Sequence, residues 1–245
     1  IDLLDINYLY MPSIDQTFKE DYLEKDENYI LKYNYEDRFI VRTGYSYIYN
    51  SAGRALMNNS GIGNSYTIRL NFESAGNLLY AVAKLGGMKK NASGEYTLLN
   101  IPFAQYLKGD FDFAKNLVID NRNSLAFHFG AGIAIPYGNA TMLPFEKRYF
   151  SGGANSVRGW SVRDLGPGSF PGDNNFMNQS GDIKLDASIE YRTRLFWKFR
   201  GALFVDAGNI WTIRDYKDQP GGQFEFDKFY KPCQIQTDLP AGLYN

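Results

Sequence analysis

The sequence is poor in the residues on which several classes of site depend. Its 245 residues hold one Cys and one His, which excludes an internal disulfide framework and argues against a zinc site. No apolar run approaches the roughly 18 residues of a membrane-spanning helix. Basic and acidic side chains number 26 and 27, so the basic excess typical of nucleic-acid binding is missing. We expect no metal, no cofactor and no nucleic-acid partner.

Aromatic residues and glycine are plentiful instead. Aromatics make up 16% of the chain, with 19 Tyr and 18 Phe beside 24 Gly. The mean hydropathy is nevertheless low, at −0.38. Soluble β-proteins have such compositions, and so do outer-membrane β-barrels, which combine aromatic girdles with polar interiors.

Alternation of apolar and polar residues is the dominant pattern, and it predicts β-strands. It is clearest over residues 182–194, where Ile183, Leu185 and Ile189 share one face and charged residues the other. The segments that alternate most clearly are 182–194, 124–137, 66–72 and 39–49, and those that do so less clearly are 3–10, 27–36, 77–86, 101–119 and 200–213. We therefore expect about nine strands and no helix, with several strands longer than the usual five or six residues.

The predicted connections alternate between long and short along the chain. Long loops are expected near 11–26, 51–62, 87–100 and 138–181. An antiparallel sheet with all its long loops at one end produces this order, and membrane barrels do so systematically. A soluble β-sandwich or barrel remains the alternative, since exchanging the roles of the two faces leaves the periodicity unchanged.

The segment 138–181 is too long for an ordinary loop, which favours a functional role. It contains the string GGANSVRGW, residues 152–160. Its glycines Gly152, Gly153 and Gly159 allow turns with positive φ, and Trp160 could anchor the loop against a wall. On its own, Arg158 would read as a solvated loop residue.

This string resembles the VRG-aromatic loop motif of the outer-membrane assembly barrels, the BamA/TamA type of bacterial surface antigen proteins. Two further matches follow in the same order: Glu190 in SIEYR, and the strand motif FVDAGNIW with Phe204, Asp206 and Gly208. The amino-acid sequence of the loop looks most like that of the TamA-like lipoprotein branch of Bacteroidetes. The resemblance covers residues 1–230.

The resemblance implies an all-β antiparallel transmembrane barrel of 16 strands, of which this chain supplies about nine, with the long loop folded into the lumen. The loop motif Gly152, Gly153, Val157, Arg158, Gly159 and Trp160 would then meet the partner carboxylates Glu190 and Asp206. The alternation of strands 182–194 and 200–213 independently turns both carboxylates to the polar face. A guanidinium taken from water needs such partners, and removing one partner of a buried pair costs roughly 3–5 kcal/mol.

The two ends of the chain depart from a complete barrel. The first residues, IDLLDINYLY, read as the inside of a strand, so we expect a C-terminal barrel fragment. Residues 1–230 form the predicted partial barrel. Residues 231–245 show no alternation, hold the only Cys, and read as an atypical or truncated tail.

Four functions suit these observations to different degrees. The resemblance implies a bacterial outer-membrane protein that assists insertion or translocation of client proteins without covalent chemistry, with or without a periplasmic or inner-membrane translocation partner. A passive channel would also use a polar lumen, and a soluble ligand-binding β-domain would line a groove with the aromatics. A hydrolase would depend on His128, but the chain has no GxSxG elbow. We therefore expect no catalytic residues.

Overall fold

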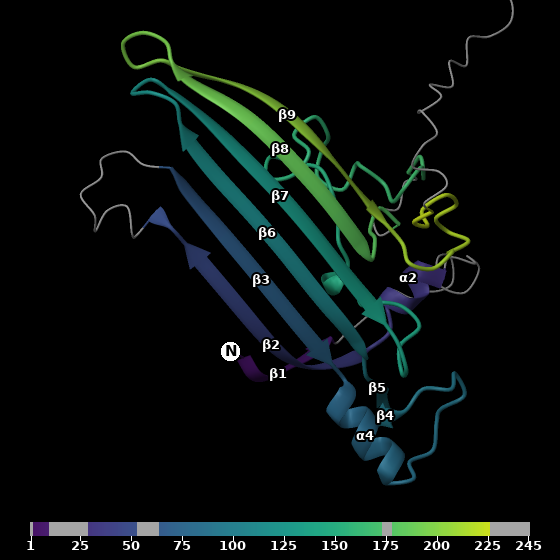
Figure 1. Cartoon of the computed structure of the whole chain (residues 1–245). Coiled ribbons are helices and arrows are strands. Elements are labelled where there is room, and N and C mark those ends of the chain that lie inside the picture. The colour runs from purple at the N-terminus through teal and green to yellow at the C-terminus, as the bar shows by residue number, and fades with distance from the viewer. Residues whose placement is uncertain (1, 10–28, 53–63, 173–177, 226–245) are drawn as a thin grey trace, which may run out of the picture.

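Seven antiparallel strands form one curved sheet, shown in Figure 1. The structure is a computed structural model, which describes residues 2–9, 29–52, 64–172 and 178–225. The strands follow in the order β1 (Asp2–Leu9), β2 (Arg38–Asn50), β3 (Ser65–Ala75), β6 (Tyr106–Val118), β7 (Asn123–Pro136), β8 (Ile183–Arg194) and β9 (Arg200–Trp211). Each strand pairs with its neighbours in this sequence order, so the sheet is a meander.

One face of the sheet is apolar and exposed. The cross-strand register places Tyr47, Leu70 and Phe111 in one row on this face. Other apolar side chains exposed on it are Tyr45, Phe72, Phe129, Ile133, Ile189, Leu203 and Val205. Val205 keeps 71% of its surface exposed. An apolar surface that spans this many strands marks a contact with lipid or protein.

The opposite face is polar and carries ion pairs. Its charged residues include Arg42, Glu73, Lys108, Asp110, Asp112, His128, Asp186, Glu190 and Asp206, which alternate with the apolar residues along the strands. Soluble antiparallel sheets turn their apolar face to the core and their polar face to water. This sheet has the reverse arrangement, because its loops pack on the polar face and leave the apolar face uncovered.

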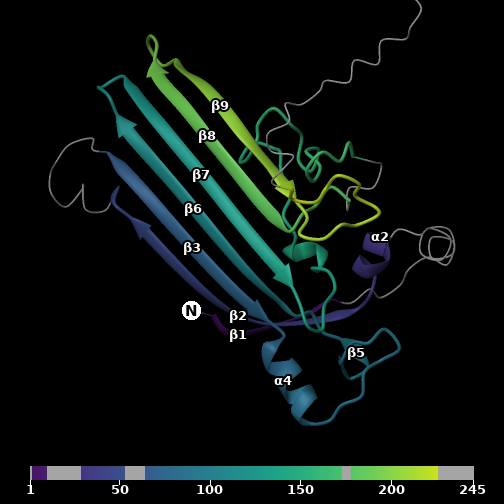
Figure 2. The same cartoon turned by 45° about the vertical axis from the view of Figure 1, so that its right-hand side comes forward.

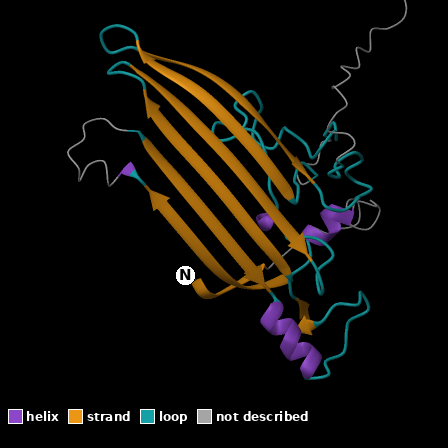
Figure 3. Cartoon of the chain, viewed as in Figure 1, coloured by secondary structure: helices purple, strands orange, loops and turns teal. Residues whose placement is uncertain are grey.

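Three long connections lie at one end of the sheet. Residues 10–37, 76–105 and 137–182 link strands at that end, whereas residues 51–64, 119–122 and 195–199 link strands at the other end, the last two as short turns. Figure 2 shows the long connections gathered beside the sheet, and Figure 3 shows both helices at the same end. The alternation of long and short connections predicted from sequence is wrong in part. The expected long loop at 51–62 falls at the end with the short turns, and the predicted order counted as strands two segments that are helices.

Two of the nine predicted strands are wrong. Residues 27–36 contain helix α2 (Tyr29–Asn34), and residues 77–86 contain helix α4 (Asn77–Leu85). In α4, Leu78, Val82 and Leu85 fit helical spacing, while the alternation of Leu78 and Val82 with small residues also fits a strand. Over so short a segment, the good helix formers Leu, Ala and Lys decide for the helix.

The main sheet therefore contains seven strands in the described part of the chain, and it is open. β1 and β9 are its edges, and a separate two-stranded pair, β4 (Thr97–Leu98) with β5 (Ile101–Pro102), occupies the start of the predicted strand 101–119. The predicted tail, 231–245, lies outside the described residues. Within those residues, no helix is long and apolar enough to cross a membrane.

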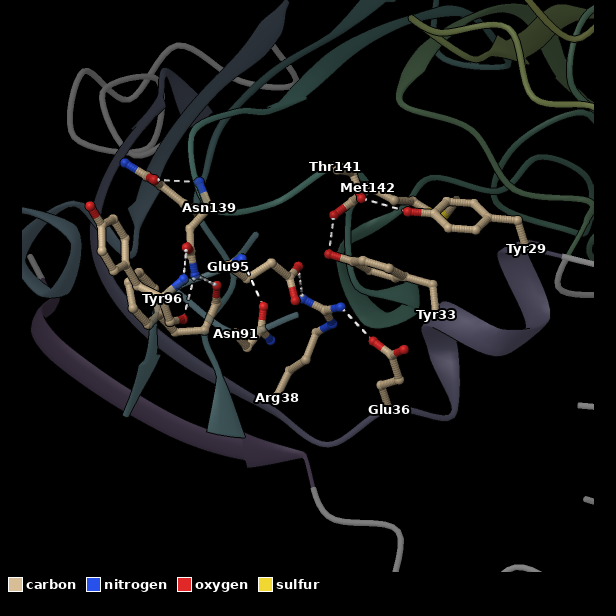
Figure 4. Close-up of polar contacts among 12 residues, drawn as sticks. Tyr29, Tyr33, Glu36, Arg38, Asn91, Glu95, Tyr96, Asn139, Thr141 and Met142 are labelled. Carbon is tan, nitrogen blue, oxygen red and sulfur yellow. Dashed lines mark hydrogen bonds and ion pairs between the residues drawn. The ribbon is translucent and has the colours of Figure 1, made fainter. Parts of the chain in front are cut away.

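Arg38 ties the three long connections together at their end of the sheet (Figure 4). Its side chain is buried, and its guanidinium bonds Glu95 at 3.1 Å and Glu36 at 2.7 Å while lying 3.7 Å from the centre of the Tyr33 ring. The Tyr33 hydroxyl in turn donates to the carbonyl of Met142 at 2.6 Å. Each connection thus contributes a partner, which fixes the loops relative to one another.

The two faces of β3 give a direct test of which one meets lipid. We expect Leu70→Arg, on the apolar face, to raise the free energy of membrane insertion by about 2–4 kcal/mol. Asn71→Arg places the same side chain on the polar face one residue away and is expected to have little effect. The measurement is the fraction of chain that resists urea extraction from liposomes. Equal losses for both variants would contradict the assignment of the faces.

Candidate functional site

The connection between β7 and β8, residues 137–182, crosses the polar face of the sheet. We call it the docked loop. Its two limbs pair near the base, where Tyr149 and Gly181 exchange backbone hydrogen bonds of 2.8 Å, and Asp182 donates its N–H to the carbonyl of Trp211 at 2.7 Å. Beyond this base, three side chains of the loop contact charged residues on three separate parts of the sheet.

The first contact is made by Lys147, at the end of a short 3-10 turn (Phe145–Lys147). Its ammonium lies 2.8 Å from one oxygen of Glu73 on β3, and Arg42 of β2 lies 2.8 Å from the other oxygen. Tyr106 of β6 also donates its hydroxyl to Glu73. This carboxylate, mostly shielded from solvent, is therefore compensated from two strands and from the loop.

The second contact is the hydroxyl of Tyr149, which donates to Asp110 of β6 at 2.5 Å. The ring is largely buried and lies directly over Gly132 of β7, where an added Cβ would come within 2.6 Å of the ring. The ammonium of Lys108 lies 4.2 Å from the ring centre. Burial raises the pKa of the Tyr149 hydroxyl well above its usual value, and the bond to Asp110 adds to this shift, so the phenol stays a donor.

The third contact is made by Arg158. Its Nε and Nη2 reach the two oxygens of Asp206 on β9, each at 2.7 Å, and its backbone N–H reaches Asp206 at 3.0 Å. Its Nη1 reaches Glu190 on β8 at 2.5 Å. Bidentate pairing of this kind is the strong form of a charged hydrogen bond. The bonds to Asp206 and then Glu190 raise the pKa of the Arg158 guanidinium above its usual value.

The surroundings of Arg158 hold its side chain at one position on the polar face of β8 and β9. The guanidinium lies 3.6 Å from the centre of the Phe204 ring, which projects from the same face of β9 as Asp206. Glu190 is shared, since its second oxygen accepts from Arg192 at 2.6 Å. Arg158 keeps 24% of its side chain exposed and Asp206 only 4%. Water can therefore reach the guanidinium but hardly the carboxylate, so Asp206 depends on Arg158 for its hydrogen bonds.

The glycines before Arg158 shape the tip of the loop. Gly152 and Gly153 have φ of 97° and 87°, and an added Cβ at Gly152 would lie 2.0 Å from the carbonyl oxygen of Ser161. Gly159 does not use the positive φ that glycine allows, and a Cβ added there would meet open space. Val157 is buried, whereas Trp160 is exposed and does not anchor the tip.

Gly208, the glycine of the strand motif, makes room for Asp186. Asp186 on β8 pairs in register with Gly130 on β7 and Gly208 on β9, and a Cβ at either glycine would come within 3.0 Å of the Asp186 side chain. His128 lies between carboxylates, 2.6 Å from Asp112 and 3.6 Å from Asp186. Through these contacts His128 belongs to the network of charged residues on the polar face.

A buried pair supports the base of the docked loop. Arg148 and Asp182 are both removed from solvent, with Nε 3.6 Å from the carboxylate. Arg148 also donates to Gln219 at 3.2 Å. Burial raises the pKa of Asp182, although Arg148 opposes this shift. Within the described residues, no three His, Cys, Asp or Glu side chains form a group that could hold a metal.

Arg158, Glu190, Asp206 and Phe204 belong to the motifs found in the sequence, and the structure brings these four side chains together. The contacts of Lys147 and Tyr149 were not predicted. One signal was available, since glycine on the inward face of β7 predicts close approach of another chain segment. Which loop residue fills the space over Gly132 could not be read from the sequence.

The contact between Tyr149 and Gly132 can be tested with a neighbouring glycine as control. We expect Gly132→Ala to displace the Tyr149 ring at a cost of about 1–3 kcal/mol, exposing the loop to chymotrypsin after Tyr149. Gly109→Ala, on the adjacent strand, adds its Cβ to open space and should leave cleavage unchanged. Equal cleavage of the two variants would show that Tyr149 does not depend on this gap.

Comparison with known proteins shows the family of the chain. The Omp85 superfamily domain matches residues 12–229. The outer membrane protein assembly factor BamA of Neisseria meningitidis serogroup B is 32% identical over 96 residues, which are 36% of this chain and 12% of that protein. The crystal structure of BamA from Haemophilus ducreyi lacking POTRA domains 1-3 has a TM-score of 0.37 and 17% identity over 72% of this chain and 43% of that chain. The chain thus corresponds to only part of the length of these relatives. Because the family match covers most of the sequence, the chain belongs to the Omp85 superfamily and is a bacterial outer-membrane protein.

Proposed function

We propose that this protein assists the insertion or translocation of other proteins at the outer membrane, without covalent chemistry. The observation that carries the proposal is the docking of Arg158 on Asp206 and Glu190 in a chain of the Omp85 superfamily. The relative from Neisseria is described as an outer membrane protein assembly factor. Clients would be guided by strand addition to an open edge of the barrel.

In this proposal the sheet is part of a closed 16-stranded barrel whose lumen is the polar face. The exposed apolar face supports this, since lipid would cover it. The docked loop then lies inside the lumen and narrows it, held by the wall at Glu73, Asp110 and Asp206. The loop sequence GGANSVRGW further suggests that the protein is a member of the TamA-like branch of Bacteroidetes, with residues 1–230 as the barrel part.

The orientation follows from the connections. Outer-membrane barrels have short periplasmic turns and longer external loops, so the turns 119–122 and 195–199 would face the periplasm. The second of these turns carries exposed Phe196, Trp197 and Phe199, with Trp197 85% exposed. Aromatic side chains concentrate at membrane interfaces, which supports a position of this turn at the periplasmic surface of the bilayer.

A passive channel is the second candidate. The polar face carries many charges, and rings of charge set ion selectivity in pores. The docked loop argues against an open pore, because it covers part of that face. Solute-selective conductance that Arg158→Ala leaves unchanged would favour the channel.

The assembly proposal predicts the consequence of removing Arg158. In cells that depend on the intact protein, Arg158→Ala should lower the level of assembled outer-membrane clients severalfold. Asp206 would remain buried and unpaired, at a cost of about 1–3 kcal/mol to loop docking. Arg158→Lys should be intermediate, because lysine lacks the bidentate fork.

Arg69→Ala is the matched control for this experiment. Arg69 lies on the same polar face, more than half exposed, and its nearest carboxylate, Asp112, is 3.8 Å away. We expect it to support normal client levels. Normal client assembly with Arg158→Ala, at wild-type protein abundance, would overturn the proposal that the docked arginine serves assembly.

A further inference from the structure

A basic cavity lies at the turn end of the polar face, apart from the tip of the docked loop. It has a volume of about 580 Å³ and is lined by residues from β3, β6, β7, β8 and β9 and from the turn 119–122. Its lining includes four arginines, Arg122, Arg192, Arg194 and Arg200. We call it the mouth cavity, because it opens at the end with the short turns.

The positive charge of the mouth cavity is only partly compensated. Its two carboxylates are Asp120 and Glu190. Asp120 is engaged by Asn123 within its own turn, and Glu190 is shared by Arg158 and Arg192. Among the described residues, the guanidinium groups of Arg122, Arg194 and Arg200 form no ion pair.

Two of these arginines oppose each other directly. Arg194 on β8 and Arg200 on β9 are register partners, and both fall on the polar face by the alternation of their strands. Like charges directly opposite across a sheet are destabilising. An anion held between the two guanidinium groups would relieve this repulsion, so the pair is suited to binding a carboxylate.

The cavity suits a peptide better than a lipid headgroup. It lies on the polar face, opposite the apolar face that we assign to lipid. Its volume falls within the range of about 300–1,000 Å³ that accommodates ligands much larger than a single small anion. Amide side chains, including Asn116, Asn121 and Asn123, line it beside the arginines and could bond to peptide backbone groups.

We propose that the mouth cavity binds an acidic segment of a polypeptide that reaches the barrel from the periplasm. The proposal rests on the membrane orientation of the proposed function. Glu190 links the cavity to the docked loop, because the same carboxylate bonds Arg192 at 2.6 Å and Arg158 at 2.5 Å. A bound acidic segment competes with Glu190 for Arg192 and leaves more of the Glu190 charge for Arg158.

The test measures binding of a short fluorescent glutamate-rich peptide to the full chain in zwitterionic detergent, by fluorescence anisotropy. We expect the double variant Arg194→Glu/Arg200→Glu to weaken binding by about tenfold or more, since two attractions become repulsions. The control is Arg69→Glu/Lys198→Glu, which changes the net charge equally at positions outside the cavity. It should retain binding within about twofold, and salt should weaken binding to the wild type.

Equal loss in the two double variants, or tight binding of a neutral peptide to the wild type, would overturn the proposal. So would displacement of the peptide by inorganic phosphate or by phosphatidylglycerol vesicles at equal charge concentration, which would assign the cavity to phosphate or lipid. A second measurement needs no variant: the peptide should protect Arg194 and Arg200 of the wild type from phenylglyoxal while Arg69 still reacts. Absence of that protection would also overturn the site.

This experiment is independent of client assembly. If the peptide binds as expected while Arg158→Ala leaves client levels normal, the assembly proposal fails and the site stands. If Arg158→Ala impairs assembly and the peptide does not bind, the site fails and the assembly proposal stands.

Discussion

The structure depends on one constraint: a sheet that turns its apolar side outward must compensate the charges of its polar side within the protein. Burying a charge without a partner is far more costly than burying an apolar group. The docked loop supplies these partners at Lys147, Tyr149 and Arg158. The carboxylates of the polar face and the donors of the docked loop are therefore complementary, and the position of each is explained by the other.

The three contacts divide the loop into parts with different environments. Tyr149 is largely buried in the space left by Gly132, and the nearby Arg148–Asp182 pair is wholly removed from water. The tip around Arg158 is more open, with Trp160 exposed. Removing Arg158 should thus free the tip while Lys147 and Tyr149 retain the base. The shared carboxylate Glu190 joins this tip to the basic mouth cavity, so one residue connects two parts of the polar face.

Much of this could be predicted from the sequence, because strict alternation over long segments fixes which residues share a face. The common polar face of Glu190 and Asp206 follows from it, whereas alternation alone does not decide which face meets lipid. The helices α2 and α4 could not be predicted in this way, since apolar residues in short segments fit both strand and helix periods. The loop partners of Glu73 and Asp110 could not be predicted either, because the alternation that identifies a strand does not show which loop residue contacts it.

The most direct test of the central claim is a double-mutant cycle between Arg158 and Asp206, read by hydrogen exchange of residues 151–165 in the reconstituted protein. If the loop is held by this pair, Arg158→Ala and Asp206→Ala should each speed exchange of the segment, and the double variant should add little. The coupling free energy would then be about 1–3 kcal/mol. Strictly additive effects, or unchanged exchange in Arg158→Ala, would show that the loop is held on the wall without this ion pair.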